Sequence, residues 1–541
     1  MFSLKADFAK TSRIAVTATI LMMCLHLGAS TTAQSSTIVN TNSGKISGVA
    51  SSDGTLISFK GVPYAAPPVG DLRWRAPKPA APWSGVLKAD HFSRSCMQAS
   101  PSSLGPWTEE YMDQNERSED CLYLNVWTES TEGKRPVLVW IHGGGFDQGS
   151  TSVALYNGEA LARKGIVVVT INYRLGVFGF FAHPELTRES DMHSSGNYGL
   201  LDTVAALEWV KANIAGFGGD PARVTIGGQS AGAMAVHALI VSPLAKGLFH
   251  GAIAESGSSI ANMLLPQADA EKDGVKFQAA KGAGSLKELR AMPVYLLMAP
   301  VECAAFRWSP VVDGSLVPDS VSAVIAQGKQ NDVATLTGWC ADEGSVDPKY
   351  GKRTPEEFER EVRRPSVGGP ASFFGLIPAG DLADEFLKLY RASTPGKSQI
   401  DSARAQKMVS MFMWAAQRAA HSKTPVYTYL WDHPLPGPNR DLYRAFHSSE
   451  LPYVFNSLAG AKRPWEPADY AIAEKTTSYW ANFVKTGNPN GDGLVNWPAL
   501  DVNTPVTMEL GDRFEVRPIA DGAQVKLLEE ILTRGLSSTG Q

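Results

Sequence analysis

The chain has 541 residues, of which 44% are hydrophobic, and it carries 13 tryptophans and a formal net charge of −4. This composition excludes a disordered protein and supplies enough apolar surface for a large core. The slightly acidic balance and the lack of any basic stripe along the chain argue against a nucleic-acid partner.

Residues 1–33 have the order of segments found in a secretory signal peptide. Basic residues precede an apolar run over residues 14–27, and small residues follow up to Ala33. The apolar run is shorter than a membrane-spanning helix needs, and a buried N-terminal helix is the alternative. We expect cleavage near Ala33, a single mature catalytic domain over residues 34–541, and a secreted or periplasmic location with no membrane contact after cleavage.

Apolar strands and helical segments alternate along the rest of the chain. Residues 136–141 and 166–171 are apolar at consecutive positions, which is typical of strands covered on both faces. Further strands are expected within 37–83 and at 118–127, 223–226, 252–254, 333–336 and 425–430, and helices at 198–214, 470–485 and 524–533. This alternation predicts an α/β fold with a mainly parallel sheet. Residues 262–308 and 347–395 lose the strand pattern, so we expect helical insertions over the sheet edge where ligands bind.

A strand, a serine bracketed by glycines and a helix follow one another around Ser230. The sequence over residues 228–232 is Gly-Gln-Ser-Ala-Gly. In this context the pattern is typical of a nucleophile elbow, a turn so tight that the residues two before and two after the serine have no room for a Cβ. The sequence therefore predicts that the Ser230 hydroxyl projects from the turn toward a base and a substrate.

Serine nucleophiles on such elbows work with an acid and then a histidine further along the chain. Asp342 and Glu343 follow an expected strand, and each is a candidate acid. Among the later histidines, His421 lies in a helical stretch and His433 precedes a proline, so both are interpreted as structural. His447 lies in a loop of small residues after the late strand, which favours it as the base.

Motifs spread over residues 38–520 resemble those of the type-B carboxylesterase/lipase family, which includes cholinesterases and bacterial p-nitrobenzyl esterases. The matching segments are 119–125, 142–146, 172–174, 196–199, 217–221, 228–232, 342–344 and the stretch 447–451. The resemblance implies an α/β-hydrolase, with a central mostly parallel sheet, flanking helices and helical cap insertions. It also implies hydrolysis of a small-molecule carboxylic ester through an acyl-enzyme, with no cofactor and no metal.

The family pattern also places a catalytic triad and an oxyanion hole on this chain. The implied site residues are the nucleophile Ser230, the acid Glu343, the base His447, the oxyanion-hole donors Gly144, Gly145 and Ala231, and a supporting serine, Ser256, that hydrogen-bonds the acid. In such a site the histidine takes the serine's proton, the acid orients the histidine, and backbone N–H groups receive the developing negative charge.

Four cysteines follow the expected signal peptide, namely Cys96, Cys121, Cys303 and Cys340. An even number in an exported chain favours disulfides, and three connectivities can form. Sequential pairing is the simplest, and Cys96–Cys121 matches an early disulfide of the family. A bridge between Cys303 and Cys340 is not a general family feature, and two free buried thiols are the alternative.

The chain departs from the cholinesterase pattern at two positions that bear on the substrate. Tyr111 stands where those enzymes have a tryptophan that binds a quaternary ammonium group, and Gln229 replaces their glutamate before the nucleophile. Both changes argue against a cationic substrate. Gln229, with Arg307 in an expected cap, favours neutral or anionic acyl groups. Exported bacterial relatives detoxify fumonisin mycotoxins by removing tricarballylate, which makes such an ester a candidate substrate.

Other functions compete with that of a secreted esterase. A non-catalytic binding protein of this family would lack the serine, whereas all three triad positions are filled here. A lipase would need a large apolar lid, but the loop between the first two cysteines carries the charged residues Glu109, Glu110, Asp113, Glu116 and Arg117. Amidase activity is a further alternative, because the same triad cleaves amides. The sequence does not predict the oligomeric state.

Overall fold

The computed structural model describes residues 37–100, 105–260, 264–302, 305–365, 374–391 and 393–537. These ranges all lie in one unit, Ser36–Gln541. The expected signal peptide, residues 1–33, lies outside the described residues. Within the described ranges, no helix combines the length and the apolar character that are needed to cross a membrane.

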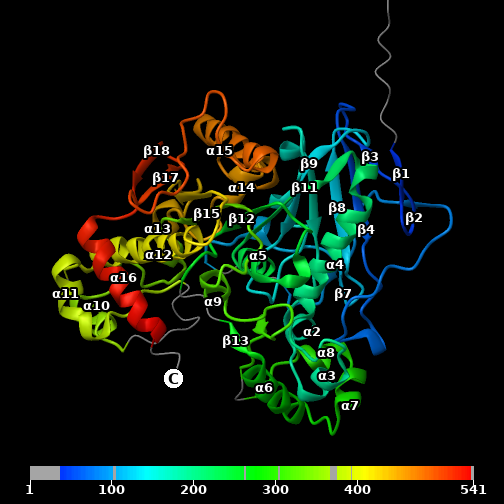
Figure 1. Cartoon of the computed structure of the whole chain (residues 1–541), viewed down its shortest axis with the longest axis horizontal. Coiled ribbons are helices and arrows are strands. Elements are labelled where there is room, and N and C mark those ends of the chain that lie inside the picture. The colour runs from blue at the N-terminus through cyan, green and yellow to red at the C-terminus, as the bar shows by residue number, and fades with distance from the viewer. Residues whose placement is uncertain are drawn as a thin grey trace, which may run out of the picture. The chain divides into compact units, whose positions relative to one another are not determined.

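The described ranges build an eleven-stranded central sheet (Figure 1). Its order is β18-β17-β16-β15-β12-β11-β9-β10-β8-β4-β3. The strands are β3 (Val49–Ala50), β4 (Ile57–Pro63), β8 (Tyr123–Thr128), β9 (Arg135–Ile141), β10 (Val167–Ile171), β11 (Gly219–Gln229), β12 (Gly251–Glu255), β15 (Ala334–Cys340), β16 (Val426–Trp431), β17 (Val506–Leu510) and β18 (Phe514–Pro518). Neighbours from β17 to β10 pair in parallel, and the outer pairs are antiparallel. The predicted mostly parallel sheet is confirmed.

Helices cover both faces of this sheet, which explains the unbroken apolar runs in its strands. All five residues of β10 and six of the seven in β9 are buried. On one face α5 (Ala231–Val241) contacts β9, β11 and β12, and α4 (Tyr198–Asn213) contacts α5. On the other face α15 (Pro467–Thr486) contacts β9 and β11 (Figure 1). Strands that are buried on both faces consist mostly of apolar residues.

The two stretches that were predicted to leave the sheet carry helices and, in their described residues, add no strand to the central sheet. The first holds α6 (Gln267–Ala280), α7 (Leu286–Ala291) and α8 (Val294–Met298), and α6 and α7 lie together at one end of the unit (Figure 1). Phe277, Leu286, Leu289 and Leu297 from these helices pack with Trp74 and Phe181 in a small apolar core of their own. The second stretch holds α10 (Pro355–Val362) and α11 (Ala383–Leu389).

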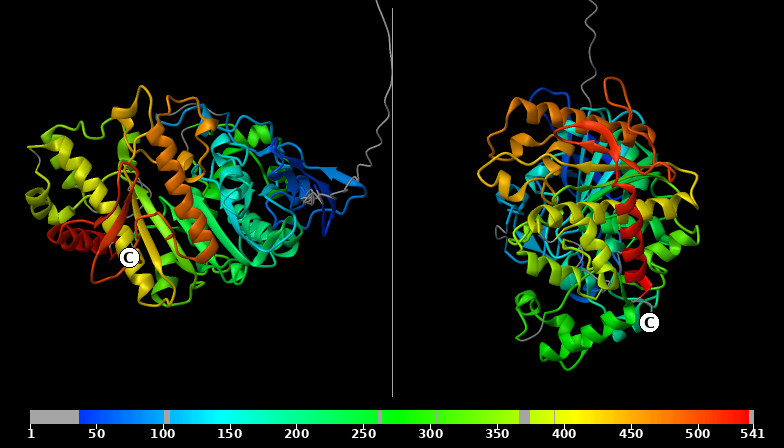
Figure 2. Two further views of the ribbon diagram at one scale, coloured as in Figure 1. Left: turned by 90° about the horizontal axis from the view of Figure 1, so that it is seen from above. Right: turned by 90° about the vertical axis from the view of Figure 1, so that its left-hand side faces the viewer.

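Apart from the helical stretch noted around His421, sequence patterns missed the 25-residue helix α12 (Pro395–Ala419), and they also missed the last two strands of the sheet, β17 and β18. α12 packs against β15, β16 and α16 (Gly522–Ser537), and Figure 2 shows it alongside α16. The predicted second insertion therefore ends where a helix on the face of the sheet begins.

Candidate active site

Ser230 occupies the turn between β11 and α5. Its backbone angles are φ 59° and ψ −122°, a conformation that residues with a side chain rarely adopt. A Cβ on Gly232 would lie 2.0 Å from the Ile141 carbonyl oxygen, and a Cβ on Gly228 would lie 2.5 Å from the Gly232 carbonyl carbon. Both glycines are therefore required by close backbone contacts, as predicted. Ser230 is half-buried, whereas its neighbours in the chain are buried.

Glu343 and His447 come together from two different loops. Glu343 begins the short 3-10 turn Glu343–Val346 after β15, and His447 precedes α14 (Leu451–Val454). His447 Nδ1 lies 2.5 Å from Glu343 Oε2, and both side chains are 3% exposed. A proton on Nδ1 leaves the lone pair on Nε2. That nitrogen lies 3.3 Å from Gln229 Nε2, so it faces the turn that carries Ser230.

Three hydrogen-bond donors hold the Glu343 carboxylate. Ser256 Oγ donates to Oε1 over 2.6 Å, the Cys340 backbone N–H donates to Oε1 over 2.8 Å, and His447 contacts Oε2. Burial pushes the pKa of Glu343 upward, but His447 and the other two donors hold it below its usual value. Glu343 is therefore an anion at neutral pH. Ser256 lies where the sequence predicted it, in contact with this residue.

Asp342, the other candidate acid, points to a different partner. Arg404 Nη2 donates to both of its carboxylate oxygens over 2.9 and 2.8 Å, and Tyr350 donates to one of them over 3.3 Å. Asp342 thus fastens α12 to the end of β15. Of the two neighbouring carboxylates, Glu343 is the one that reaches His447.

The histidine His433 is held between two carboxylates. Its Nδ1 lies 2.6 Å from Asp512 and its Nε2 lies 3.0 Å from Asp469. His421 follows the end of α12, where its backbone N–H donates to the Arg418 carbonyl. These contacts agree with the interpretation of both histidines as structural.

The glycine loop after β9 lies against the nucleophile elbow. A Cβ on Gly143 would lie 2.7 Å from a backbone carbonyl oxygen of β11 and 3.2 Å from Ser230 Cβ, so only glycine allows this approach. Gly144 and Gly145 follow with φ of 113° and 67°. Ala231 is the first residue of α5, so its N–H has no acceptor within the helix. The three predicted oxyanion-hole donors thus lie on the two segments that meet at Ser230.

Aromatic side chains that sequence reasoning missed hold the His447 loop. Trp107 Nε1 donates to the His447 carbonyl over 3.2 Å, and the Phe374 ring lies edge-on to the imidazole at 5.0 Å. Tyr111 was noted in the sequence only because cholinesterases have a tryptophan at this position. Its hydroxyl donates to the Ser448 carbonyl over 3.1 Å. Nothing local marks Trp107 or Phe374, because their role depends on how distant loops pack.

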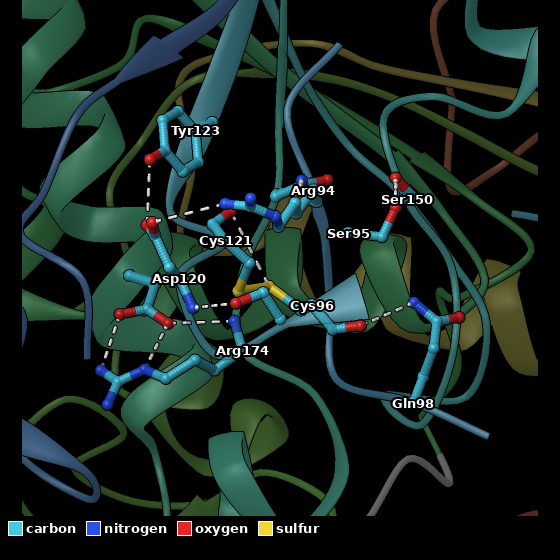
Figure 3. Close-up of a disulfide and its surroundings, with 12 residues drawn as sticks. Arg94, Ser95, Cys96, Gln98, Asp120, Cys121, Tyr123, Ser150 and Arg174 are labelled. Carbon is cyan, nitrogen blue, oxygen red and sulfur yellow. Dashed lines mark hydrogen bonds and ion pairs between the residues drawn. A yellow bond between two sulfur atoms is a disulfide. The ribbon is translucent and has the colours of Figure 1, made fainter. Parts of the chain in front are cut away.

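The disulfide between Cys96 and Cys121 is present, which confirms that prediction (Figure 3). Gln98 donates to the Cys96 carbonyl over 3.1 Å, and Ser95 donates to Asp113 over 2.6 Å. The bridge closes the loop that carries both Trp107 and Tyr111. It therefore anchors the segment that positions the His447 backbone.

Cys340 is a free, buried thiol, which agrees with the alternative of free thiols and not with a bridge to Cys303. Cys303 itself lies outside the described residues. The Cys340 thiol donates to Glu450 Oε2 over 2.9 Å. Burial raises the pKa of Glu450 to about 7, and burial together with Glu450 raises the pKa of the thiol well above its usual value. The thiol thus stays protonated and serves as a hydrogen-bond donor to a buried carboxyl group.

The cap residue Arg307 is exposed and lies near Asp147, which directly follows the glycine loop. Desolvation raises the pKa of Asp147 to about 6, and the positive charge of Arg307 opposes that shift. Arg307 is therefore an exposed side chain close to the loop that carries two of the expected oxyanion-hole donors.

A nucleophile elbow on a parallel sheet, with a glutamate and a histidine on later loops, is the arrangement of serine hydrolases with the α/β-hydrolase fold. The chain belongs to the carboxylesterase family, whose model matches residues 35–527. This confirms the resemblance to type-B carboxylesterases and the prediction of a carboxylic ester hydrolase.

Three curated relatives show what the chain is similar to. It is 36% identical over 503 residues to para-nitrobenzyl esterase of Bacillus subtilis (strain 168), covering 88% of this chain and 96% of that protein. It is 33% identical over 499 residues to fumonisin B1 esterase of Sphingopyxis macrogoltabida, covering 85% and 84%. It is 36% identical over 513 residues to cocaine esterase of Oryctolagus cuniculus, covering 86% and 91%. A solved structure of PNB esterase superposes with a TM-score of 0.76 at 33% identity, covering 91% of this chain and 99% of that one.

Proposed function

We propose that the chain hydrolyses carboxylic esters through an acyl-enzyme formed on Ser230. His447 Nε2 takes the hydroxyl proton as Ser230 Oγ attacks the ester carbonyl carbon. The N–H groups of Gly144, Gly145 and Ala231 receive the oxyanion of the tetrahedral intermediate. The intermediate collapses by breaking the bond to the alcohol oxygen, which takes the proton from the imidazolium. Water then repeats the same steps and releases the acid.

The contact between Glu343 and His447 is the observation that carries this proposal. The 2.5 Å separation from Oε2 to Nδ1 fixes the imidazole with Nε2 toward the elbow. Because Glu343 is anionic and buried, it stabilises the imidazolium that forms when Ser230 loses its proton. An uncharged partner in its place would leave the histidine free to adopt the wrong tautomer.

We further propose neutral or anionic acyl groups, such as those of a fumonisin-type mycotoxin ester, in a detoxifying enzyme. Gln229 supplies no negative charge beside Ser230, and Arg307 places a positive charge near the glycine loop. The relative fumonisin B1 esterase supports this substrate class. The signal-like residues 1–33 support export to the periplasm or the medium.

Replacing the nucleophile tests the proposed function. Ser230→Ala should abolish turnover of a p-nitrophenyl ester while the circular dichroism spectrum and melting temperature stay those of the wild type. Ser84→Ala, at an exposed serine before the strand Val86–Lys88, is the matched control and should keep full activity. Retained turnover in Ser230→Ala would remove Ser230 from the mechanism.

A further inference from the structure

Glu450 is a buried carboxyl group that lies next to the triad and has no part in the mechanism described above. It follows His447 by three positions in the chain, and its side chain is 0% exposed. Its Oε2 accepts a hydrogen bond from the Cys340 thiol over 2.9 Å. The backbone N–H of the same cysteine donates to Glu343 Oε1 over 2.8 Å. Cys340 therefore bonds both the triad acid and this second carboxyl group.

Another buried carboxyl group, that of Glu255, interacts with Glu450. Trp480 Nε1 donates to its Oε1 over 2.6 Å, and its backbone carbonyl accepts the N–H of Ser230 over 2.8 Å. Burial and the neighbouring Glu450 raise the pKa of Glu255 well above its usual value, so its side chain is a neutral acid at pH 7. Of these two carboxyl groups, Glu450 is the one that can ionise near neutral pH.

Three buried polar atoms in this region make no hydrogen bond to another residue in the described part of the chain. They are Glu255 Oε2, Glu450 Oε1 and the hydroxyl oxygen of Tyr429, a phenol whose charge would be opposed by both carboxyl groups. A protonated carboxyl group and a phenol are hydrogen-bond donors, whereas a carboxylate oxygen is an acceptor. The surroundings of Glu450 thus include further donors for its charged form, which a buried anion requires.

The charges of Glu450 and His447 depend on each other. Burial raises the pKa of Glu450 to about 7, Glu343 adds to that shift, and the Cys340 thiol and a positive charge on His447 oppose it. An imidazolium at His447 therefore favours the charged form of Glu450. Because such coupling is reciprocal, a charged Glu450 also stabilises the imidazolium that forms when Ser230 loses its proton.

We propose that Glu450 is a second acid of the site, whose carboxylate adds to that of Glu343 in stabilising the His447 imidazolium, and that the Cys340 thiol holds it for this role. This inference rests on the proposed function, because it takes His447 as the base. Glu450 acts on the reaction through His447 and is in that sense a positioning residue. The rate should then depend on whether Glu450 is charged.

The other groups around Glu450 keep their charge state near neutral pH. Within the described residues, the titratable groups that interact with it are Glu343, His447, Cys340, Glu255, Tyr429, Tyr156 and Tyr111. Burial holds the pKa values of the thiol, of Glu255 and of the three phenols above their usual ranges, so these groups stay neutral. Glu343 stays an anion. A change of rate near pH 7 thus reports the coupled titration of Glu450 and His447.

The test is the pH dependence of kcat/KM for phenyl acetate, a neutral ester, in the wild type and in Glu450→Gln. Below about pH 6 the wild-type Glu450 is protonated, so the two proteins should have the same kcat/KM. Above about pH 8 only the wild type carries the charge, and kcat/KM of the variant should level off about 10-fold lower, the effect of one charge acting through the protein interior. The midpoint of the rise should also lie at lower pH in the variant, because its imidazolium has lost a stabilising charge.

Substitutions of Cys340 test the thiol separately. Cys340→Ala removes a donor to Glu450, so the carboxylate forms less readily and the rise in kcat/KM should move to higher pH. Cys340→Ser keeps a donor at this position and should keep the wild-type profile. Asp432→Asn is the matched control. Burial and Glu509 raise the pKa of Asp432 to about 7 as well, but this residue interacts with Glu509 and Asp512, so its loss should leave the profile unchanged.

A lower kcat/KM in Glu450→Gln by the same factor at every pH, or a profile identical to that of the wild type, would overturn the inference and leave the esterase assignment intact. A wild type that hydrolyses neither phenyl acetate nor p-nitrophenyl acetate would instead count against the proposed function. Melting curves show whether each variant folds. If Glu450→Gln does not fold, the two Cys340 variants decide. A rise at higher pH in Cys340→Ala than in Cys340→Ser supports the role of Glu450, and identical profiles would contradict it.

Discussion

The Glu343 carboxylate keeps its charge in a buried site because several groups bond to it. Ser256, the Cys340 backbone and His447 together outweigh the desolvation that would otherwise favour the neutral acid. An anion with this many partners has a fixed position, and it fixes the ring of His447 in turn. The orientation of His447, the proposed base, is thus determined by the residues that hold Glu343.

The two neighbouring carboxylates should respond differently to substitution. We expect Glu343→Gln to lower kcat by about 10³-fold or more, because the amide no longer stabilises the imidazolium or selects its tautomer. Asp342→Asn removes the charge that holds Arg404, so it should lower the melting temperature and reduce kcat far less. Steady-state kinetics and thermal melting of both variants check this. The opposite ranking of kcat values would move the acid to Asp342.

Glu450 should make stability depend on pH. Burial raises its folded-state pKa from an ordinary 4.5 to about 7, so the folded state favours the protonated form, and stability from this group is lost as pH rises between those values. Glu450→Gln removes the ionisation. Relative to the wild type, the variant should gain about 1–3 kcal/mol of unfolding free energy between pH 5 and pH 8. Urea unfolding at several pH values measures this, and a constant difference would refute it.

At the level of elements, the disulfide-closed loop supports the base. Trp107 and Tyr111 hold the backbone around His447, and Glu110 forms an ion pair with Arg463 over 2.7 Å. Glu110, one of the charged residues that argue against a lipase lid, therefore ties the loop to the rest of the unit. The described part of the loop is therefore held against the backbone around His447.

Removing this disulfide should affect both stability and rate. Cys96→Ser with Cys121→Ser should lower the free energy of unfolding by about 3 kcal/mol, because the unfolded chain is no longer cross-linked over 25 residues. It should also lower kcat, since Trp107 and Tyr111 lose their anchor. Denaturant unfolding and steady-state kinetics measure the two effects. A variant with wild-type stability and rate would show that packing alone holds the loop.

Sequence patterns predicted the elements whose signal is local. β9 and β10 are unbroken apolar runs because both of their faces are buried, and the glycines of the elbow are required by close contacts with the turn and with the end of the neighbouring strand β9. The helix α12 was missed because its buried face includes polar residues, among them Ser398, Gln399, Ser402 and Gln406. Gln406 is satisfied by the backbone of Ile377, 29 positions away, and no local pattern reveals such a partner.

The residues of the candidate site also divide into those with a local sequence signal and those without one. Ser230 is marked by its own turn, and chain order narrowed the acid and the base to a few residues before the family pattern chose among them. Trp107 and Phe374 escaped notice because each acquires its position from an element packed against it. The state of Cys340 could not be predicted for a related reason. The even cysteine count said nothing of Glu450, which bonds the Cys340 thiol.

For the whole molecule, the sheet brings together side chains that are far apart in the sequence. Ser230, Glu343 and His447 follow β11, β15 and β16, which run parallel within one sheet, so the segments after them emerge at one edge. The same architecture underlies PNB esterase.

Covalent labelling tests the central claim, that Ser230 forms the acyl-enzyme, most directly. The enzyme is incubated with a fluorophosphonate, which reacts with activated serines, and is then digested and analysed by mass spectrometry. We expect one phosphonyl group per chain on the peptide that contains Ser230, in step with the loss of esterase activity, and no adduct in Glu343→Gln over the same time. Inactivation with the adduct on a different residue, or full labelling of Ser230 without loss of activity, would contradict the account.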